Sequence, residues 1–283
     1  MSAVETPAFT VLLPVYRGDD PGFLRRSLAS VTRDQALRPD EVLIVRDGPV
    51  PPGLQAVLDR ADVLCDGVPV RVLALPRNAG LARALEAGLA EVRTDVVARQ
   101  DADDISLPGR FEAQLPLMAE GYQLVGSAIQ EFEEEAATDG LVRRQPSAIE
   151  DIRDAMTLRD PFNHPSVVYS AEAVRGAGGY EHLDLMEDYW LFARMVASGT
   201  RATNLPQVLV RYRVGAGAYA RRGGMRLLRS ELELQRRMHV AGMTSRAQLA
   251  RNVAVRAGYR LVPTSVRQAA YRTAQRVLLS RTR

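Results

Sequence analysis

The segment FTVLLPVYRGDDPGFLRRSLASV, Phe9–Val31, contains the pattern that decides the fold of this chain. Its first part, Phe9–Pro14, is apolar at consecutive positions, which is typical of a strand buried on both faces. Asp20 then precedes Pro21, a usual pair for the cap and first turn of a helix, and apolar residues follow at the spacing of one helix face. The segment therefore predicts a buried strand, a loop and an amphipathic helix.

The same alternation recurs through the first half of the chain. Short apolar runs that predict further strands are Glu41–Val45, Val70–Leu75, Asp95–Arg99 and Gln123–Ala128. After Asn78 and Gly80, an apolar stripe of leucines predicts another helix. Strands that alternate with helices imply an α/β fold with a mainly parallel central sheet and helices on both faces.

Ligands of such sheets collect at the carboxyl ends of the strands, because the loops there converge. The loops expected at this edge are Val15–Asp20, Arg46–Val50, Arg77–Gly80 and Gln100–Ser106. Their polar side chains include Asp47, Asn78, Asp101, Asp103 and Asp104. We expect an acidic crevice that could bind a nucleotide phosphate only together with a cation that offsets the repulsion.

The sequence RQDADDIS, Arg99–Ser106, carries the strongest chemical signal. Asp101 and Asp103 would repel each other unless they are solvated, hydrogen-bonded or bridged by a hard cation such as Mg²⁺ or Mn²⁺. The alternative is an acidic surface turn before a helix that begins near Pro108, with Ser106 as its cap. A calcium loop of the helix-loop-helix type is excluded, because the required Gly and Glu are missing.

The composition indicates an ordinary soluble globular protein, with 46% hydrophobic and 25% charged residues among 283. The sequence shows neither an apolar run of 18 residues nor a secretory signal, so we expect a cytoplasmic protein. Cys65 is the one cysteine, which excludes an internal disulfide and a thiolate zinc site, and we expect it in the core.

Charge is segregated along the chain, and every one of the 37 basic residues is Arg. Residues 214–283 contain 15 of them against two acids, and their composition is helical. Nucleic-acid binding is not expected, because no recognition motif accompanies this charge. The remaining interpretations are a basic helix on an anionic membrane surface and a terminal helix pair packed on the acidic first domain.

Several motifs occur in a fixed order, namely TVLLPVYRGD, VLIVRDGP, NAGLARALEAGL, VARQDADDIS, NHPSVVY, GGYEHLDLMEDYWLFARMVASG and VRYRVGAGAYARRGG. Together they resemble family 2 glycosyltransferases of the GT-A fold, in particular bacterial enzymes of polysaccharide and lipid-linked oligosaccharide assembly. The resemblance covers residues 8–225. It implies a GT-A catalytic domain at residues 1–213 and a basic, mostly helical extension at residues 214–283, which is a candidate for peripheral membrane attachment.

The resemblance also implies a nucleotide-sugar site. Its residues would be Pro14, Tyr16, Asp47, Asn78, Arg83, Arg99, Asp101 and Asp103. Pro14 and Tyr16 would line the nucleotide pocket, and Asp47 would accept a hydrogen bond from the uracil or its ribose. Asp101 and Asp103 would hold Mn²⁺ or Mg²⁺ with the diphosphate. Arg46 departs from the family pattern, in which many relatives carry an acid at this position. This difference bears on which nucleobase the donor carries.

The resemblance assigns the general base to Asp188 and a supporting role to Glu187, within MEDYWLFARM. Acids at a helix start can also serve only the helix dipole. Acceptor or diphosphate contacts are expected from His164, Trp190, Arg213, Arg221 and Arg222. For His164 a structural role, and for the arginines a solvated basic turn, are the alternatives.

The expected function is an inverting, metal-dependent transfer of a hexose, with galactose or glucose favoured. The donor would be a UDP-sugar, and the acceptor a hydroxyl of a glycan or of a polyprenyl-diphosphate-linked saccharide. A non-catalytic binding partner in a polysaccharide assembly complex is the alternative. A sugar-nucleotide pyrophosphorylase would need a Gly- and Arg-rich loop after the first strand, where this chain has PVYRGDD. The oligomeric state is not indicated.

Overall fold

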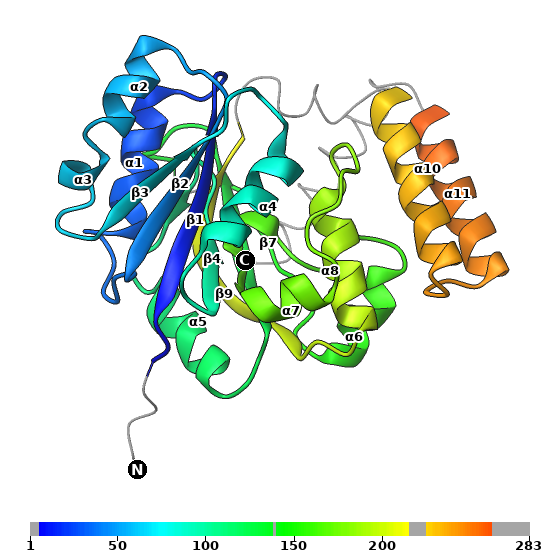
Figure 1. Ribbon diagram of the computed structural model, residues 1–283. Helices are drawn as coiled ribbons and strands as arrows, with labels where there is room; N and C mark the ends of the chain where they lie inside the picture. Colours follow the sequence, from blue (N-terminus) through cyan, green and yellow to red (C-terminus); the bar gives the residue numbers. More distant parts are fainter. Residues whose placement is uncertain (1–5, 138–139, 215–224, 262–283) are drawn as a thin grey trace. The chain divides into compact units, whose positions relative to one another are not determined.

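The strand predicted at the start of the chain lies within a parallel block of the central sheet. A computed structural model of the protein describes residues 6–137, 140–214 and 225–261 (Figure 1). The block consists of β1 (Phe9–Tyr16), β2 (Glu41–Asp47), β3 (Val70–Ala74) and β4 (Val96–Arg99). Each neighbouring pair is parallel, in the order β3-β2-β1-β4. All four were predicted, and their carboxyl ends share one edge.

The sheet continues beyond β4 with strands that come later in the chain. They are β5 (Ile105–Ser106), β6 (Leu124–Phe132), β7 (Val142–Arg143), β8 (Val168–Ser170) and β9 (Ala202–Arg213). β8 is antiparallel to β4 and β6, whereas β6 and β9 are parallel. β5 pairs with the end of β9, so that Arg211 and Val210 face the strand just after the aspartates. Most paired residues lie in parallel pairs, and the sheet is mixed.

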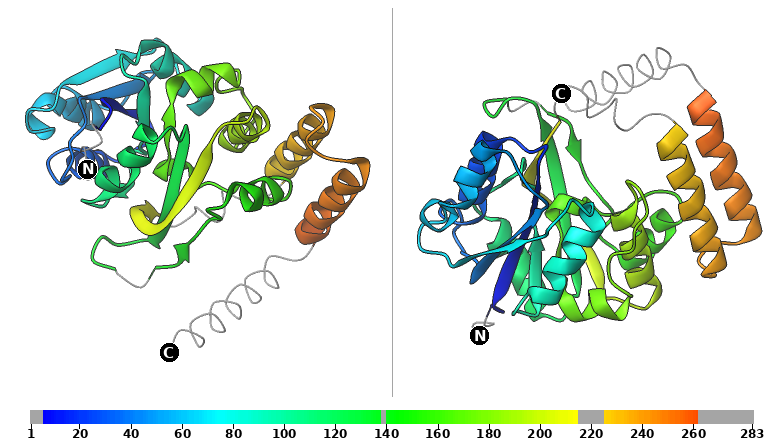
Figure 2. Two further views of the ribbon diagram at one scale, coloured as in Figure 1. Left: turned by 90° about the horizontal axis from the view of Figure 1, so that it is seen from below. Right: turned by 45° about the horizontal axis from the view of Figure 1, so that its top comes forward.

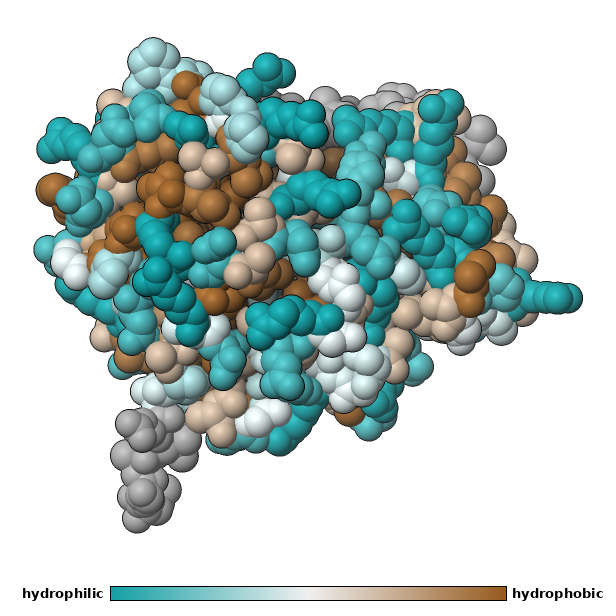
Figure 3. Space-filling view, viewed as in Figure 1, coloured by the Kyte–Doolittle hydropathy of each residue, from teal (hydrophilic) through white to brown (hydrophobic). Residues whose placement is uncertain are grey.

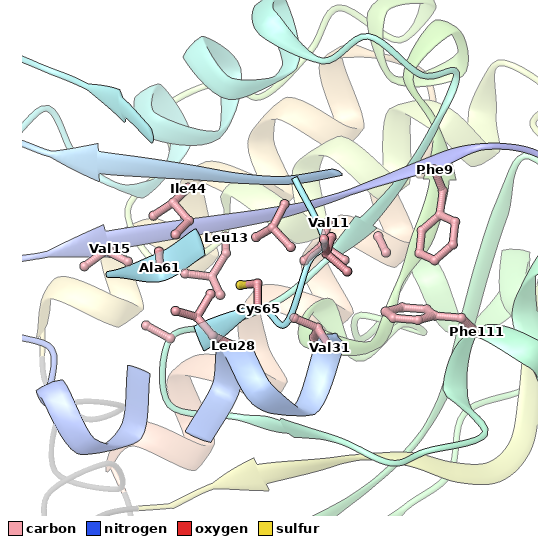
Figure 4. Packing of buried hydrophobic residues seen from close by; sticks show 14 of the residues in the cluster. Phe9, Val11, Leu13, Val15, Leu28, Val31, Ile44, Ala61, Cys65 and Phe111 are labelled. Carbon is pink, nitrogen blue, oxygen red and sulfur yellow. The ribbon is translucent and has the colours of Figure 1, made fainter. Parts of the chain in front are cut away.

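One face of the parallel block packs against α1 (Pro21–Val31), α2 (Pro52–Leu58), α3 (Ala61–Leu64) and α5 (Arg110–Ala119). Val11 and Leu13 of β1 point into this core, together with Leu28 of α1 (Figure 4). Cys65 lies in the same cluster and is fully buried, as predicted. The expected cap of α1 is confirmed, because Asp20 Oδ1 accepts from the Gly22 nitrogen at 2.7 Å.

The opposite face is covered by α4 (Leu81–Glu91), which contacts β1 and β2. The contact is close because Gly88 has no side chain: a Cβ there would lie 2.5 Å from Leu12 Cδ1 and 2.9 Å from Val45 Cγ2. Helices therefore cover both faces, as predicted. At the β3 end of the sheet the space-filling view shows apolar residues gathered over β3 and its neighbours, and Val72 is 42% exposed (Figure 3).

Further helices follow in the chain between residues 149 and 197, and β8 lies among them in sequence. They are α6 (Ile149–Met156), the 3₁₀ turn η1 (His164–Ser166), α7 (Ala171–Gly176) and α8 (Glu187–Ala197). α8 begins at the predicted pair Glu187 and Asp188, and its apolar side is buried. Met186 is its N-cap and makes no side-chain cap hydrogen bond.

By its contacts the chain divides into two compact units, Met1–Tyr219 and Ala220–Arg283. In the second unit, α10 (Met225–Val240) and α11 (Arg246–Leu261) lie side by side (Figure 2). Asn252 Nδ2 donates to Gln235 Oε1 at 2.7 Å in their buried contact. None of the described helices is long and apolar enough to cross a membrane. Arg221, Arg222 and most of the predicted amphipathic segment at residues 259–283 lie outside the described residues.

Candidate active site

The loop after β4 brings the predicted aspartates together in a partly buried environment. Arg99, fully buried, holds Asp101 by a contact of 2.5 Å between Nη2 and Oδ1. Burial, with the charge of Asp101, raises the pKa of Asp103 to about 6. Asp104 is fully buried, and its Oδ1 accepts from the backbone nitrogen of Arg213 at 2.8 Å. Compared with the alternative of an acidic surface turn, the loop is therefore partly buried and held by directed contacts.

Ser106 does not cap the following helix, which corrects the second half of that alternative. The N-cap of α5 is Gly109, and no side chain bonds to the first turn there. Ser106 lies in β5, is buried, and donates from Oγ to Gln100 Oε1 at 2.8 Å. The short strand β5 pairs with β9, and the N-cap of α5 follows three residues after Ser106.

Asp19 is a further carboxylate at the same place, and it was not among the predicted site residues. It lies in the loop after β1, where Oδ2 accepts from the Tyr16 nitrogen at 2.8 Å. Burial raises the pKa of Asp19 to about 7, and the charges of Asp103 and Asp101 add to this rise. Its position in the strand-end loop Val15–Asp20 was the signal that could have identified it.

These carboxylates fit a divalent cation by the chemistry of their oxygens. Mn²⁺ and Mg²⁺ prefer hard oxygen ligands, and Mg²⁺ is usually held by one or two carboxylates plus substrate phosphates. Throughout the described residues, no group of three or more His, Cys, Asp or Glu side chains is arranged to hold a metal.

A buried polar network fixes the shape of the acidic loop from behind. Arg110 is fully buried and donates to the Arg99 carbonyl at 2.8 Å and to Gln100 Oε1 at 2.9 Å. Gln100 Nε2 in turn donates to the Asp104 carbonyl, and Ser27 Oγ of α1 donates to that of Asp101. Arg110 and Ser27 were not predicted as part of the site, and Gln100 lies within the motif VARQDADDIS but was given no role.

Replacing Arg110 by Met is expected to lower the free energy of unfolding by about 3 kcal/mol, because several buried acceptors lose their donor at once. Chemical denaturation followed by circular dichroism measures this change. Arg33→Met is the matched control, since Arg33 is exposed and its ion pair with Asp34 is long, at 3.7 Å. An equal and small effect of both substitutions would contradict the role of the network.

Asp47 joins the loops that follow β2 and β3. It is buried, and its carboxylate accepts from Asn78 Nδ2 at 2.8 Å, from the Ala79 nitrogen at 2.6 Å and from the Gly80 nitrogen at 2.9 Å. Gly48 adopts a positive φ of 81° and approaches the Asn78 backbone, where a Cβ would clash. Asp47 and Asn78 thus meet as expected, and they shape this corner of the crevice.

The other residues predicted for the nucleotide lie near the same edge. Tyr16, at the end of β1, pairs in register with Asp47 and is 48% exposed. Arg83 is exposed in the first turn of α4. Arg46 Nη1 donates to Gln55 Oε1 of α2 at 2.9 Å. Contacts of these side chains with a nucleotide stay predictions.

Arg213, at the end of β9, lies against the acidic loop. Its Nε donates to the Asp103 carbonyl at 3.0 Å. The guanidinium carbon is 3.7 Å from the ring centroid of Phe23 and 4.4 Å from that of Phe132, so the group is stacked on two aromatic side chains. Arg213 therefore lies beside the predicted aspartates, and its contact with a diphosphate stays a prediction.

Asp188 lies in the first turn of α8, three residues after a strained backbone position. Leu185 has a φ of 62°, which is rare for a residue with a branched side chain. Asp188 Oδ1 accepts from the Tyr189 nitrogen at 2.8 Å, and Oδ2 lies 3.5 Å from His164 Nδ1. Burial, with the charge of Asp188, raises the pKa of Glu187 to about 7. The protonated form of Glu187 is therefore favoured relative to that of an exposed glutamate.

His164 connects this carboxylate to the acidic loop. Burial lowers its pKa to about 4, and the charge of Arg99 adds to this effect, while Asp188 and Asp101 act in the opposite direction. His164 lies in η1, which contacts β4, the strand that precedes the acidic loop, and it is also 3.5 Å from Asp188. Trp190 is 6% exposed, and its Nε1 donates to Glu181 at 2.9 Å. Its expected acceptor contact stays a prediction.

Comparison with known proteins identifies the family of this chain. The model of glycosyl transferase family 2 matches residues 10–173. The chain therefore belongs to glycosyltransferase family 2, and it is a glycosyltransferase. It is 36% identical to the amylovoran biosynthesis glycosyltransferase AmsE of Erwinia amylovora, over 93% of this chain and 97% of that protein. It is 34% identical to an Escherichia coli UDP-Gal:α-D-GlcNAc-diphosphoundecaprenol β-1,3-galactosyltransferase, over 95% and 96%.

Solved structures show the same fold at low sequence identity. TarS of S. aureus in complex with UDP-GlcNAc matches with a TM-score of 0.65 and 15% identity, over 87% of this chain and 70% of that one. A mannosyltransferase of Pyrobaculum calidifontis, in complex with GDP-Man and Mn²⁺, matches with a TM-score of 0.62 and 15% identity, over 95% and 81%. The GT-A fold expected from the motifs is confirmed.

Proposed function

We propose that the protein is an inverting, metal-dependent hexosyltransferase that uses a UDP-sugar donor and a hydroxyl acceptor. The observation that carries this proposal is the position of His164, which is 3.5 Å from Asp188 and is within the electrostatic influence of Arg99 and Asp101. In an inverting displacement, the leaving diphosphate and the general base lie on opposite faces of the sugar ring. Membership of the transferase family favours this function over that of a non-catalytic binding partner.

The donor is a UDP-sugar, with galactose favoured and glucose second. The relative from Escherichia coli is named for UDP-Gal and matches nearly the whole chain, which supports this choice. Tyr16 and Asp47, at the ends of β1 and β2, would position the nucleotide, with Asn78 and Arg83 beside them. Pro14 would line the same pocket, two residues before Tyr16 in β1.

Asp103 and Asp101 would hold Mn²⁺ or Mg²⁺ together with the diphosphate. Bound there, the ion would stabilise the negative charge that develops on the departing UDP. Arg99 already pairs with Asp101, which limits that carboxylate and leaves Asp103 as the better placed ligand. Arg213 would cover the diphosphate from the end of β9, since it is fixed against the Asp103 carbonyl.

Asp188 would accept the proton of the acceptor hydroxyl. Glu187, with its pKa raised to about 7, would bind an acceptor hydroxyl next to it. The acceptor would be a glycan or a saccharide linked to a polyprenyl diphosphate, a class that the name of the Escherichia coli relative supports. Residues 1–213 would form the catalytic domain. Residues 214–283, with 15 Arg and two acids, would attach to an anionic membrane surface beside such an acceptor.

A donor screen tests this proposal. The full chain is incubated with Mn²⁺ and with UDP-, GDP- and dTDP-sugars, with and without a GlcNAc-diphospho-lipid acceptor, and nucleotide release is measured. We expect UDP release from UDP-galactose or UDP-glucose to exceed release from the other donors by about tenfold or more, since one well-matched set of polar contacts discriminates at that level. Chelation of the metal should abolish it. A protein that releases no nucleotide from any donor would contradict the proposal.

A further inference from the structure

The buried histidine next to the proposed base makes two directed contacts. His164 Nδ1 lies 3.5 Å from Asp188 Oδ2, and His164 Nε2 lies 3.2 Å from the Tyr180 hydroxyl. The imidazole also packs against Phe192, with ring centroids 6.0 Å apart. Its position is therefore fixed on three sides, by α8 and by the loop before it.

The protonation states determine which ring nitrogen of His164 carries the hydrogen. Burial keeps the pKa of Tyr180 well above its ordinary value, so its phenol keeps the proton and can donate it to Nε2. His164 is neutral at pH 7, because burial lowers its pKa to about 4. A neutral imidazole that accepts at Nε2 carries its hydrogen on Nδ1, which is the nitrogen beside Asp188.

The residues around Asp188 explain why the Nδ1–H group of His164 matters for the orientation of its carboxylate. Glu187 and Asp160 are acids that interact with Asp188 electrostatically, and each has a pKa raised by burial and by the Asp188 charge. With their pKa values raised, these two acids hold their protons more readily and repel Asp188 less than free carboxylates would. An N–H group on the other side gives the carboxylate a fixed orientation without adding a net charge that would weaken it as a base.

Tyr180 is itself held in place, which makes the chain of contacts rigid. Its backbone nitrogen donates to Glu86 Oε2 of α4 at 2.7 Å. Arg194 of α8 donates from Nη2 to the carbonyl of Gly179, the preceding residue, at 2.6 Å. The loop that carries the phenol is thus tied both to α4 and to the helix that carries Asp188.

We propose that His164 is a positioning residue whose Nδ1–H orients the Asp188 carboxylate toward the acceptor hydroxyl, with the Tyr180 hydroxyl selecting the required tautomer. This inference rests on the proposed function, in which Asp188 is the base. It replaces the expected contact of His164 with the acceptor or the diphosphate by a role that acts through Asp188.

Two amide substitutions separate the two nitrogens of the ring. The side-chain amide of Asn places an N–H group near the position of Nδ1, whereas that of Gln reaches the position of Nε2. With UDP-galactose, Mn²⁺ and a GlcNAc-diphospho-lipid acceptor, His164→Gln is expected to lower kcat about 100-fold, the effect of a base displaced by about 1 Å. His164→Asn should stay within about tenfold of the native kcat, and both should keep KM for UDP-galactose within about threefold.

His182→Asn is the matched control, because His182 is exposed and pairs with Asp184 at 3.6 Å. Its kcat should equal that of the native protein. Thermal unfolding and calorimetric UDP binding with Mn²⁺ establish that each variant is folded. If His164→Gln does not fold, Tyr180→Phe carries the test, and a kcat reduced about tenfold at unchanged KM supports the proposal.

Equal kcat values for His164→Asn and His164→Gln would overturn the positioning role, and so would a raised KM with unchanged kcat. Native kcat in Tyr180→Phe would overturn it as well. Full activity of His164→Gln beside an inactive Asp188→Asn would remove this inference and leave the proposed function intact. Full activity of Asp188→Asn would instead remove the base assignment itself.

Discussion

Replacing Asp188 by Asn is expected to lower kcat for sugar transfer by about 10³-fold, because the amide cannot accept the proton of the acceptor hydroxyl. UDP binding in the presence of Mn²⁺ should be unchanged by calorimetry, since Asp188 lies on α8 and not in the loop after β4. The substitution preserves shape and leaves the backbone contact of Oδ1 with Tyr189 in place. Steady-state kinetics with saturating UDP-galactose measure the loss.

The control is Asp184→Asn, four residues earlier, where the carboxylate faces the exposed His182 at 3.6 Å. It should transfer sugar at the native rate. If Asp188→Asn lost UDP binding together with activity, Asp188 would be a ligand of the nucleotide or its metal. If it kept activity, another group would be the base, and Glu187 would be the first to examine.

Replacing Asp103 by Ala is the second change with a large expected effect. It should abolish Mn²⁺-supported UDP binding and lower kcat/KM by about 10³-fold or more, because the metal term in the transition state amounts to several kcal/mol. The backbone of the loop should persist, since the Asp103 carbonyl still accepts from Arg213 and the network of Arg110 and Gln100 is untouched. Calorimetry with and without Mn²⁺ measures the binding.

Asp62→Asn serves as the control for this prediction, because Asp62 is an exposed residue of α3. Its metal-dependent UDP binding should match that of the native chain. Retention of Mn²⁺-dependent binding by Asp103→Ala would show that Asp101 or Asp19 holds the ion instead. Retention of full transfer activity without metal would contradict metal dependence altogether.

The parallel block was predictable from sequence because its strands are apolar at consecutive positions. β1, β2, β4 and the start of β6 follow that rule, whereas β3 is an edge strand of half-buried and exposed residues. The helices α1 and α4 were predictable from apolar residues spaced along one helix face. β9 was missed: it contains Pro206, it alternates irregularly, and its register with β6 shifts between Ser127 and Ile129. β5, β7 and β8 are two or three residues long and exist only through distant pairing. No local pattern encodes such strands.

The residues of the candidate site also divide into those that the sequence predicted and those that it did not. Residues that belong to motifs, such as Asp101 and Asp188, could be named from the sequence. Arg110 could not, because a charged residue in a helix is ordinarily exposed, and its burial here depends on hydrogen-bond acceptors in β4, in β5 and at Gln100. The helix expected near Pro108 illustrates a related error, since Ser106 matches the preference for a cap but is committed to Gln100.

The central claim is that the aspartates after β4 and the carboxylate of Asp188 flank one hexose ring. The most direct measurement is a crystal structure of Asp188→Asn with Mn²⁺ and UDP-galactose. The account predicts the ion on Asp103 and the diphosphate, and the anomeric carbon between that diphosphate and the amide of residue 188. An anomeric carbon that turns the diphosphate side toward residue 188, or a sugar beyond the reach of that residue, would contradict it.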